Sequence, residues 1–583
     1  MTAIFDTVIR GGTIIDGTRF PRYIGDVGIS HGVVAKIGRI AKGAGRYEID
    51  AHGLIVAPGF IDLHTHYDAQ VHWDPYCTGA SWHGFTTVMT GNCGFGFAPC
   101  RPEHRDRAML MMENTEQVPI AAMRTAMSWD WVTFPEWMDH LRSVPKGVNM
   151  MMYMPVNPLL IYVMGIEAAK TREATEAERV EMRQLLHEAM DAGACGFAFS
   201  QLGKANLHLD YDGTPMPSDI MAFAEVENLA RVLQERDEGI IQVLCEIPGA
   251  EKEARWKTER LAEISGRPVL YNAVLPVDAM PDHHRNGLRW LEAANAKGHR
   301  IYGQGATGRF WSEFTMRENN LWGAVPSLHT FQIAPPEEKL RLARDPEFRA
   351  AVRADNANVE LMYTGLGPIN TVVFKSARGH SRWSGFEQRR IEEIAADLSS
   401  DVIDTFFEII ADTNLDGDFR TPSVSSENPE LQKEVLGHDL VIPGTSDGGA
   451  HVKFFCGNGY STDIIAWLIR EHKLFTLEDF HFRMSSMPAK VVGLTDRGTL
   501  EVGKAADIVV YDYEAVDHDV FNFALAEDLP NGDWRRVDHA RGYRHVLVNG
   551  EEILNDGVTS GLTPGRVLRI TEERAPVFAM AAE

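Results

Sequence analysis

The sequence has little of what marks exported or membrane-bound proteins. It holds only six cysteines in 583 residues and no Cys-x-x-Cys pair, which favours a reducing compartment over a disulfide framework. No run of about 18 apolar residues occurs, and the N-terminus lacks the basic and apolar regions of a signal peptide. These absences predict a soluble protein that is not exported, with the cytoplasm as its compartment and no membrane partner.

Basic residues are also in short supply. Lys and Arg total 57 against 82 for Asp and Glu, which gives a formal net charge of −25. A surface this negative repels phosphate backbones, so nucleic acid is not expected as a partner. Long Pro, Gln or Ser tracts are missing, and an apolar fraction of 44% is that of an ordinary globular protein. The acidity itself says nothing about a substrate.

The two ends of the chain share a pattern of short strands. Residues 4–57 read as strands separated by Gly-Gly, Asp-Gly and His-Gly turns. The pattern returns beyond about residue 490, in RGTLEVGKAADIVVYD and YRHVLVNGEEIL. Because 583 residues are too many for one hydrophobic core, a smaller second domain is expected. We predict that residues 1–57 and 490–583 form one composite β-sandwich domain.

Residues 58–489 alternate between apolar strand patterns and amphipathic helices such as AEVENLARVLQERDEG. Eight such apolar runs can be counted, and eight is the number of parallel strands in a (β/α)8 barrel. We therefore predict an α/β protein with a TIM-like barrel plus the small β-sandwich domain. One connection is far longer than a crossover needs, and it is predicted to be a long insertion at about residues 310–385 that caps the site.

Two histidines mark the end of the first barrel strand. His64 and His66 are separated by one residue, so in a strand both imidazoles point the same way, toward the carboxyl-terminal mouth of the barrel. Two imidazole nitrogens at one point can bind one metal ion. Paired histidines also occur on ordinary surfaces, so this signal is weak until other ligands are found near it.

Asp447 supplies a carboxylate at the end of the last strand, in GTSDGGAH. The first and last strands of a barrel are neighbours, so Asp447 is expected to face His64 and His66. One carboxylate oxygen can bind a metal while the other accepts a proton from the water that attacks a carbonyl. The alternative is an N-cap for the following helix. Since Gly448 and Gly449 leave room for a ligand, we predict Asp447 as metal ligand and catalytic residue.

Several motifs together resemble the amidohydrolase superfamily, and within it the N-acyl-D-amino-acid deacylase (D-aminoacylase) branch: HTHYD, GNCG at 91–94, SDGGAH, GLTDRGTLEVGKAADIVVYD and PGRVLR. The similarity runs from about residue 4 to 570, interrupted by the insertion. It implies that the HxH pair binds one metal position, that the Cys of GNCG ligates or bridges, and that the Asp of SDG is the catalytic acid or base. These roles fall on His64, His66, Cys93 and Asp447.

Cys93 also has a setting that favours a ligand. It ends the second apolar run, beside the strand that carries His64 and His66, and Gly91 and Gly94 allow a close approach to a metal. A lone cysteine is more often a small buried hydrophobe, which is the alternative for Cys93.

The sequence departs from the family pattern at two metal positions. Relatives carry a histidine at the ends of the fifth and sixth strands, whereas this chain reads VLCEIPG (243–249) and LYNAVLP (270–276). One divalent ion is therefore expected instead of two, with zinc as the default for a His, Cys and carboxylate ligand set. Cys245, Glu246 and Asn272 are the candidates to replace the missing histidines.

Further polar residues are candidates for substrate binding because they are expected near the mouth of the barrel. They are Glu246, Tyr271, Asn272, Lys375, Arg378 and His451. The two cations belong to the insertion, where they are hypothesised to bind a substrate carboxylate. Ordinary surface charge is the alternative for both.

The leading prediction is a hydrolase of carbon–nitrogen bonds other than peptide bonds. It acts on a small-molecule amide, an N-acyl (D-)amino acid or a related N-acyl amine, by metal-activated water. A hydrolase that opens a cyclic amide, lactam or imide, or a deaminase, is the first alternative, because the missing histidines loosen the tie to deacylases. A non-catalytic barrel used for binding is the second. The sequence leaves stereochemistry undecided and a homo-oligomer open.

Overall fold

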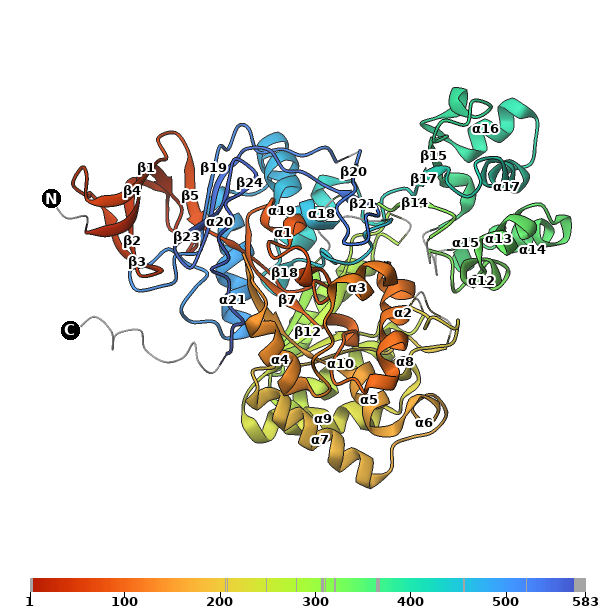
Figure 1. Ribbon diagram of the computed structural model, residues 1–583, viewed down its shortest axis with the longest axis horizontal. Coiled ribbons are helices and arrows are strands. Elements are labelled where there is room, and N and C mark those ends of the chain that lie inside the picture. The colour runs from red at the N-terminus through yellow and green to blue at the C-terminus, as the bar shows by residue number, and fades with distance from the viewer. Residues whose placement is uncertain are drawn as a thin grey trace.

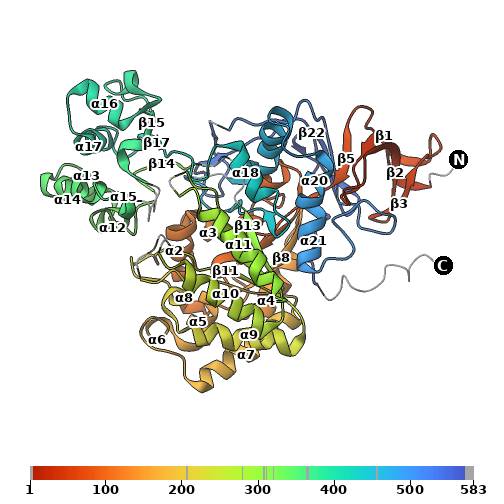
Figure 2. The ribbon, with the colours of Figure 1, turned by 180° about the vertical axis from the view of Figure 1, so that it is seen from behind.

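The structure is a computed structural model that describes residues 4–570, except 205, 207, 248, 279, 306–308, 310, 319–320, 363–366, 455–456 and 521. Figure 1 shows three parts: a β-sheet near the chain ends, a central body of parallel strands and helices, and a separate lobe that projects on the far side. Figure 2 shows the same arrangement from behind. Within the described part of the chain, no helix is long and apolar enough to cross a membrane.

The central body is built on parallel strands in two sheets, ordered β6-β7-β8 and β9-β10-β11-β12-β13-β18. Each of the eight predicted apolar runs contains one of these strands, with β8 and β9 in the same run. Almost all of their residues are buried, as expected for parallel strands covered on both faces. The bounds are Phe60–Asp62 (β6), Phe85–Thr90 (β7), Asn149–Met152 (β8), Met154–Pro155 (β9), Gly196–Ser200 (β10), Ile240–Leu244 (β11), Val269–Val274 (β12), Ile301–Gly305 (β13) and Val441–Pro443 (β18).

Two connections link the two parallel sheets. Only Tyr153 separates β8 from β9. On the other side, a parallel bridge pairs Thr65, after β6, with Gly448, after β18. The N–H of His66 also donates to the carbonyl of Gly448 at 2.6 Å. These connections bring the first and last strands together, as the predicted barrel requires, while the closed barrel itself stays a prediction.

Helices follow the strands and cover them from outside (Figures 1 and 2). The helix α7 begins with a capping box in which Thr175 and Glu178 satisfy each other's backbone N–H groups. The helix α10 ends at Gly266, whose positive φ of 62° suits a C-cap. The main helices of this body are Arg105–Glu116 (α2), Phe134–Ser143 (α4), Val156–Met164 (α5), Glu176–Asp191 (α7), Phe223–Arg236 (α9), Glu251–Ser265 (α10), His283–Ala296 (α11) and Pro429–Leu436 (α18).

Strands from both ends of the chain share one sheet, in the order β24-β23-β22-β19-β5-β1-β2-β3, with β4 paired to β1. The N-terminal β5 pairs antiparallel with the C-terminal β19, so the two ends meet. A second layer, which a β-sandwich needs, stays a prediction. The bounds are Phe5–Ile14 (β1), Tyr23–Ser30 (β2), Val33–Gly38 (β3), Gly45–Asp50 (β4), Ile55–Pro58 (β5), Ile508–Tyr511 (β19), Tyr543–Val548 (β22), Glu551–Asn555 (β23) and Val558–Thr559 (β24).

Gly59 joins this sheet to the first parallel strand. A Cβ atom at this position would lie 2.2 Å from the side chain of Thr86 on β7, so no larger residue fits. The N–H of Gly59 donates to the carbonyl of Asp507 at 3.0 Å. The chain therefore passes from one sheet to the other within a single residue, close to the predicted domain boundary at 57.

The insertion forms the projecting lobe, with a four-stranded antiparallel sheet in the order β14-β17-β15-β16. It runs past the predicted end near residue 385, because β17 pairs with β14 and because Phe406 and Phe407 lie in the core of the lobe. Phe454, from the segment after β18, packs in the same core. The bounds are Glu313–Thr315 (β14), Pro326–Ile333 (α12), Pro336–Ala343 (α13), Pro346–Asn356 (α14), Val359–Met362 (α15), Val373–Ser376 (β15), Arg389–Arg390 (β16), Ile391–Leu398 (α16), Val402–Asp412 (α17) and Asp418–Arg420 (β17).

Candidate metal centre

Three predicted ligands come together at the carboxyl ends of the first two parallel strands. Donor atoms of His64, His66 and Cys93 all lie within 4.8 Å of one another. The Sγ of Cys93 is 3.4 Å from the Nε2 of His64. All three side chains are buried. Two imidazoles and a thiol at this spacing form a donor set that suits zinc.

The predicted carboxylate reaches the same point from the last strand. The Oδ1 of Asp447 lies 3.2 Å from the Nε2 of His64 and 3.6 Å from the Nε2 of His66. The side chain of Asp447 keeps 25% of its surface exposed, whereas both histidines are enclosed. Asp447 therefore lies at the boundary between the buried cluster and the solvent.

The backbone is held in unusual conformations at this centre. Cys93, Asp447 and His451 have positive φ angles of 56°, 48° and 53°, a region that side chains other than glycine seldom adopt. Such conformations persist only where the surroundings enforce them, and they cluster at functional sites. Around Cys93 the surroundings include Asn92, whose side-chain amide donates to the carbonyls of Thr65 and Met89.

Glycines allow the close approach of the loops. A Cβ atom on Gly449 would lie 2.7 Å from the carbonyl oxygen of His66, and one on Gly91 would lie 2.7 Å from that of Tyr153. Both glycines also have positive φ angles. The SDGG and GNCG motifs thus need these glycines for backbone packing against neighbouring strands.

Two buried glutamines orient the ligands from other strands. The Nδ1 of His64 lies 3.1 Å from the Oε1 of Gln304 on β13. The N–H of Cys93 donates to the Oε1 of Gln242 on β11 at 2.7 Å. Neither glutamine was singled out from the sequence, because a glutamine inside a strand carries no motif.

Burial and charge shift the ionisation of these groups. Burial raises the pKa of the Cys93 thiol to about 12. Burial would also raise the pKa of Asp447, but its hydrogen bond with His66 and the charges of both histidines hold it well below its usual value. Burial lowers the pKa of His64. For His66, burial is outweighed by the charge of Glu116 and the hydrogen bond with Asp447, which raise its pKa well above the usual value.

Two residues that the sequence did not indicate lie beside the centre. Glu116, at the end of α2, has its Oε1 3.9 Å from the Nε2 of His66. His208, in the loop after β10, contacts the ring of Phe95 edge-on. Burial lowers the pKa of His208 to about 4, although the charge of Asp447 acts in the opposite direction. Neither residue stands at a strand end or in a metal-ligand spacing, so no sequence signal could have found them.

His451, a tentative substrate residue, lies at the cluster. Its Nε2 is 3.4 Å from the Oε2 of Glu116, and its backbone N–H donates to the carbonyl of the same residue. Asn272 lies nearby as well, because its Oδ1 accepts a hydrogen bond from Thr445 at 3.4 Å, two residues before Asp447. Burial lowers the pKa of His451 to about 3.

Glu246 and Tyr271 face other partners. Glu246 accepts a hydrogen bond from the Tyr271 hydroxyl, and its carboxylate lies 2.9 Å from His283 and 3.5 Å from Arg255. His283 belongs to helix α11 and Arg255 to helix α10. These contacts of Glu246 stabilise the packing of the two helices, which does not fit the predicted metal or substrate role.

Lys375 and Arg378 also differ from their predicted role. Lys375 pairs with the buried Glu313, and Arg378 lies 3.0 Å from Asp418. Arg536 contacts both of these carboxylates, at 3.1 Å and 2.6 Å. The two cations therefore balance carboxylates inside the insertion, which does not fit the predicted binding of a substrate carboxylate.

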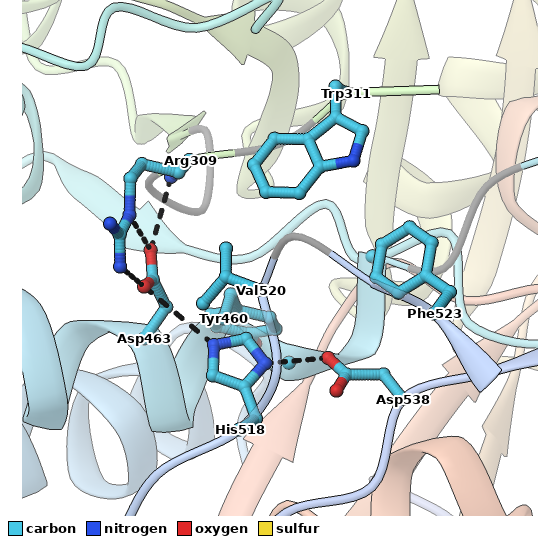
Figure 3. A pocket seen from close by; sticks show the side chains of 10 residues that line it. Arg309, Trp311, Tyr460, Asp463, His518, Val520, Phe523 and Asp538 are labelled. Atoms are coloured by element: carbon cyan, nitrogen blue, oxygen red, sulfur yellow. Dashed lines mark hydrogen bonds and ion pairs between the residues drawn. The ribbon is translucent and has the colours of Figure 1, made fainter. Parts of the chain in front are cut away.

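A pocket between the insertion and the C-terminal segment is lined by ion pairs (Figure 3). Arg309 lies 2.5 Å from Asp463, and the Nδ1 of His518 lies 2.7 Å from Asp538. The Nε2 of His518 faces Asp463 at 3.7 Å. Two cations and two carboxylates balance each other here, so the pocket has the charges of an internal salt-bridge network.

Comparison with known proteins decides the family. Residues 47–554 match the model of the Amidohydrolase family, which is most of the chain. The chain belongs to this family. It is therefore a hydrolase of carbon–nitrogen bonds other than peptide bonds, as the sequence predicted.

Two amidohydrolase relatives align over nearly their whole length. D-aminoacylase of Alcaligenes xylosoxydans xylosoxydans is 25% identical over 580 residues, covering 97% of this chain and 98% of the relative. N-acyl-D-aspartate deacylase of the same organism is 24% identical over 575 residues, covering 97% and 95%. The predicted resemblance to the D-aminoacylase-like branch of the amidohydrolases is thereby confirmed.

Solved amidohydrolase structures share the fold. A crystal structure of D-aminoacylase superposes with a TM-score of 0.65 at 22% identity, covering 97% of this chain and 100% of the other. N-acyl-D-glutamate deacylase from Bordetella bronchiseptica, complexed with zinc and a phosphonate inhibitor, gives a TM-score of 0.63 at 24% identity, covering 97% and 99%. The predicted α/β class is consistent with both.

Proposed function

We propose that this amidohydrolase removes the acyl group from N-acyl amino acids of the D series, or from closely related N-acyl amines. The observation that carries this proposal is the convergence of His64, His66, Cys93 and Asp447 from the segments that follow the first, second and last parallel strands. The full-length similarity to proteins named D-aminoacylase and N-acyl-D-aspartate deacylase supports the substrate class. The predicted (β/α)8 barrel would place this cluster at its carboxyl-terminal mouth.

The donor set fits one divalent ion, with zinc as the default. The Nε2 atoms of His64 and His66, the Sγ of Cys93 and the carboxylate of Asp447 would hold it. When bound, the ion supplies Lewis acidity and makes hydroxide available near neutral pH. The fit rests on the chemistry of the buried donors and on the Nδ1–Gln304 contact, which leaves the Nε2 of His64 as the lone-pair donor.

Asp447 would act as the general base and then the general acid in this reaction. Its Oδ1 faces both imidazoles, which leaves Oδ2 to accept the proton of the attacking water. The same oxygen can then deliver that proton to the amine nitrogen as the amide bond breaks. The exposed quarter of the side chain gives the substrate access, while the enclosed histidines stay shielded from bulk water.

We also propose that His451 and Asn272 contact the substrate. Both flank the segment that carries Asp447, and both can donate hydrogen bonds. Glu246, Tyr271, Lys375 and Arg378 are left out of this proposal because their contacts are with internal partners.

The test is an assay of metal-free and zinc-loaded protein on N-acyl-D-amino acids, N-acyl-L-amino acids and cyclic amides. The expected result is release of a free amine from the D-series substrates, lost on chelation and restored by zinc. Full activity in protein shown to be metal-free would contradict the proposal. A single ring-opened product from a cyclic amide, without activity on the acyl amino acids, would favour the alternative hydrolase.

A further inference from the structure

Glu116 is a buried carboxylate that lies beside the proposed metal ligands and outside every motif quoted above. It is the last residue of α2, in the segment that follows β7 and Cys93, and only 2% of it is exposed. Its Oε1 faces the Nε2 of His66 at 3.9 Å, and its Oε2 faces the Nε2 of His451 at 3.4 Å. The carboxylate thus lies between two imidazoles from the segments that follow the first and last parallel strands, β6 and β18.

The ordinary partners of a buried carboxylate are missing around Glu116. Among the residues that the structure describes, no Lys or Arg forms an ion pair with it, and its Oε2 has no hydrogen-bond partner. Within the same described set, the Nδ1 of the buried His66 also has none. An enclosed carboxylate whose basic neighbours are histidines alone is costly to keep ionised, and proteins normally neutralise such a group by pairing it or by binding a metal.

Other negative groups increase this need for a cation. Asp68 is fully buried two residues after His66, and Asp447 approaches the same imidazole at 3.6 Å. Three carboxyl groups therefore surround His66, with histidines as the only nearby basic groups in the described structure. A divalent ion would balance them, and zinc accepts a carboxylate oxygen together with imidazole and thiolate ligands.

We propose that Glu116 binds the metal ion together with His66 and Asp447, and that His451 holds its second oxygen. One ligand would thereby come from helix α2, in a chain that lacks histidines at the ends of the fifth and sixth strands. His451 would act as a positioning residue, because hydrogen bonds to a ligating carboxylate orient it. This inference rests on the proposed function, since it needs the metal centre to exist.

The ends of the fifth and sixth strands, which lack histidines, do not supply this extra ligand. At the fifth and sixth strands, Glu246 is bound to His283 and Arg255, and Asn272 contacts Thr445. Neither position offers a side chain that faces His66 in the described contacts. Glu116 faces it at 3.9 Å, so the extra ligand would come from helix α2.

The test measures metal binding directly. Apo protein, Glu116→Gln and the control Asp106→Asn, an exposed carboxylate in the first turn of the same helix, are titrated with cobalt(II) and followed by visible absorption. The expected result is binding at least about 10-fold weaker in Glu116→Gln, with an altered cobalt spectrum, and wild-type behaviour in the control. Equal affinity and an identical spectrum in Glu116→Gln would overturn the inference.

A second variant covers the case in which Glu116→Gln does not fold. His451→Gln keeps the carboxylate but removes its imidazole partner, and it is expected to weaken cobalt binding by a smaller factor. Unchanged affinity and spectrum in this variant would remove His451 from the proposal. Wild-type protein that binds no cobalt at all would contradict the proposed function itself, whereas a normal wild type beside an unaffected Glu116→Gln contradicts this inference alone.

Discussion

The Nδ1 of His64 lies 3.1 Å from the side-chain oxygen of Gln304, across the central strands. An amide oxygen can only accept a hydrogen bond, so Nδ1 carries the proton and Nε2 keeps the lone pair. That lone pair is directed at the space shared with Cys93 and Asp447. A buried residue of β13 therefore sets the form in which His64 can bind a metal.

Replacement of Gln304 tests this relationship. Gln304→Leu is expected to weaken zinc binding by about 10- to 100-fold, because the ring of His64 loses the partner that fixes its orientation. Gln304→Glu keeps an acceptor oxygen and is expected to bind zinc at least as tightly. Competition with a chromophoric chelator measures the affinity, with Gln184→Leu on α7 as the control. Equal affinities in all the proteins would contradict the proposed orientation.

Asp447→Asn separates proton transfer from metal binding. The amide keeps an oxygen near His64 but cannot accept the proton of the attacking water, so kcat is expected to fall by about 10²- to 10⁴-fold. The zinc content should fall much less than kcat. Steady-state kinetics and elemental analysis measure the two effects, with the exposed Asp439→Asn as the control. A kcat close to that of the wild type would exclude Asp447 as the general acid or base.

Cys93→Ser tests the thiol as a ligand. A thiolate bound to cobalt(II) gives a charge-transfer absorption that a hydroxyl does not give. Cobalt-loaded wild-type protein is expected to show this band and Cys93→Ser to lack it, because the Sγ of Cys93 lies beside His64 and His66. Cys100→Ser, a buried cysteine outside the cluster, should keep the band. Survival of the band in Cys93→Ser would mean that the thiol is not bound.

Lys375→Met distinguishes the internal ion pair from an anion-binding role. Loss of the cation leaves the buried Glu313 with Arg536 alone, which should destabilise the insertion by about 3 kcal/mol while KM stays unchanged. Urea unfolding and substrate saturation curves measure the two effects, with the exposed Lys252→Met as the control. A large rise in KM with normal stability would restore the role that the sequence suggested.

The sequence predicted the parallel strands and the side chains that meet in the candidate metal centre because those signals are local. An apolar run that ends in glycine predicts a buried strand, and the positions of His64, Cys93 and Asp447 at the ends of such runs predict a common edge. The compartment and the oligomeric state stay predictions. So does the exact number of metal ions.

Residues that contribute through tertiary packing gave no such signal. Glu116 ends a helix whose buried face contains several methionines, and Gln304 is one polar residue in a buried strand. The ion-pair partners of Lys375 and Glu246 could not be predicted either, because two residues far apart in the chain that form an ion pair have no characteristic spacing in the sequence. Their contacts depend on how the insertion and the helices pack, which a single sequence does not reveal.

The salt-bridge network around His518 should make stability depend on pH. Burial alone would lower the pKa of His518, but the charge of Asp538 and hydrogen bonds with Asp463 and Asp538 raise it to about 10. In the unfolded chain a histidine has a pKa of about 6.5. Because the folded protein holds this proton more tightly, the stabilisation is complete below pH 6.5 and is lost as the pH rises toward 10.

His518→Asn should remove this dependence, since the amide keeps a donor for Asp538 but does not titrate. The free energy of unfolding of the wild type is expected to fall, relative to the variant, by up to about 1.4 kcal/mol per pH unit between pH 7 and 9. Urea unfolding of both proteins at pH 6, 7, 8 and 9 measures the difference, in which all other titrating groups cancel. Stability curves that run parallel over this range would show that His518 is neutral in the folded protein, and its contact with Asp538 in Figure 3 would then be a hydrogen bond from an uncharged ring.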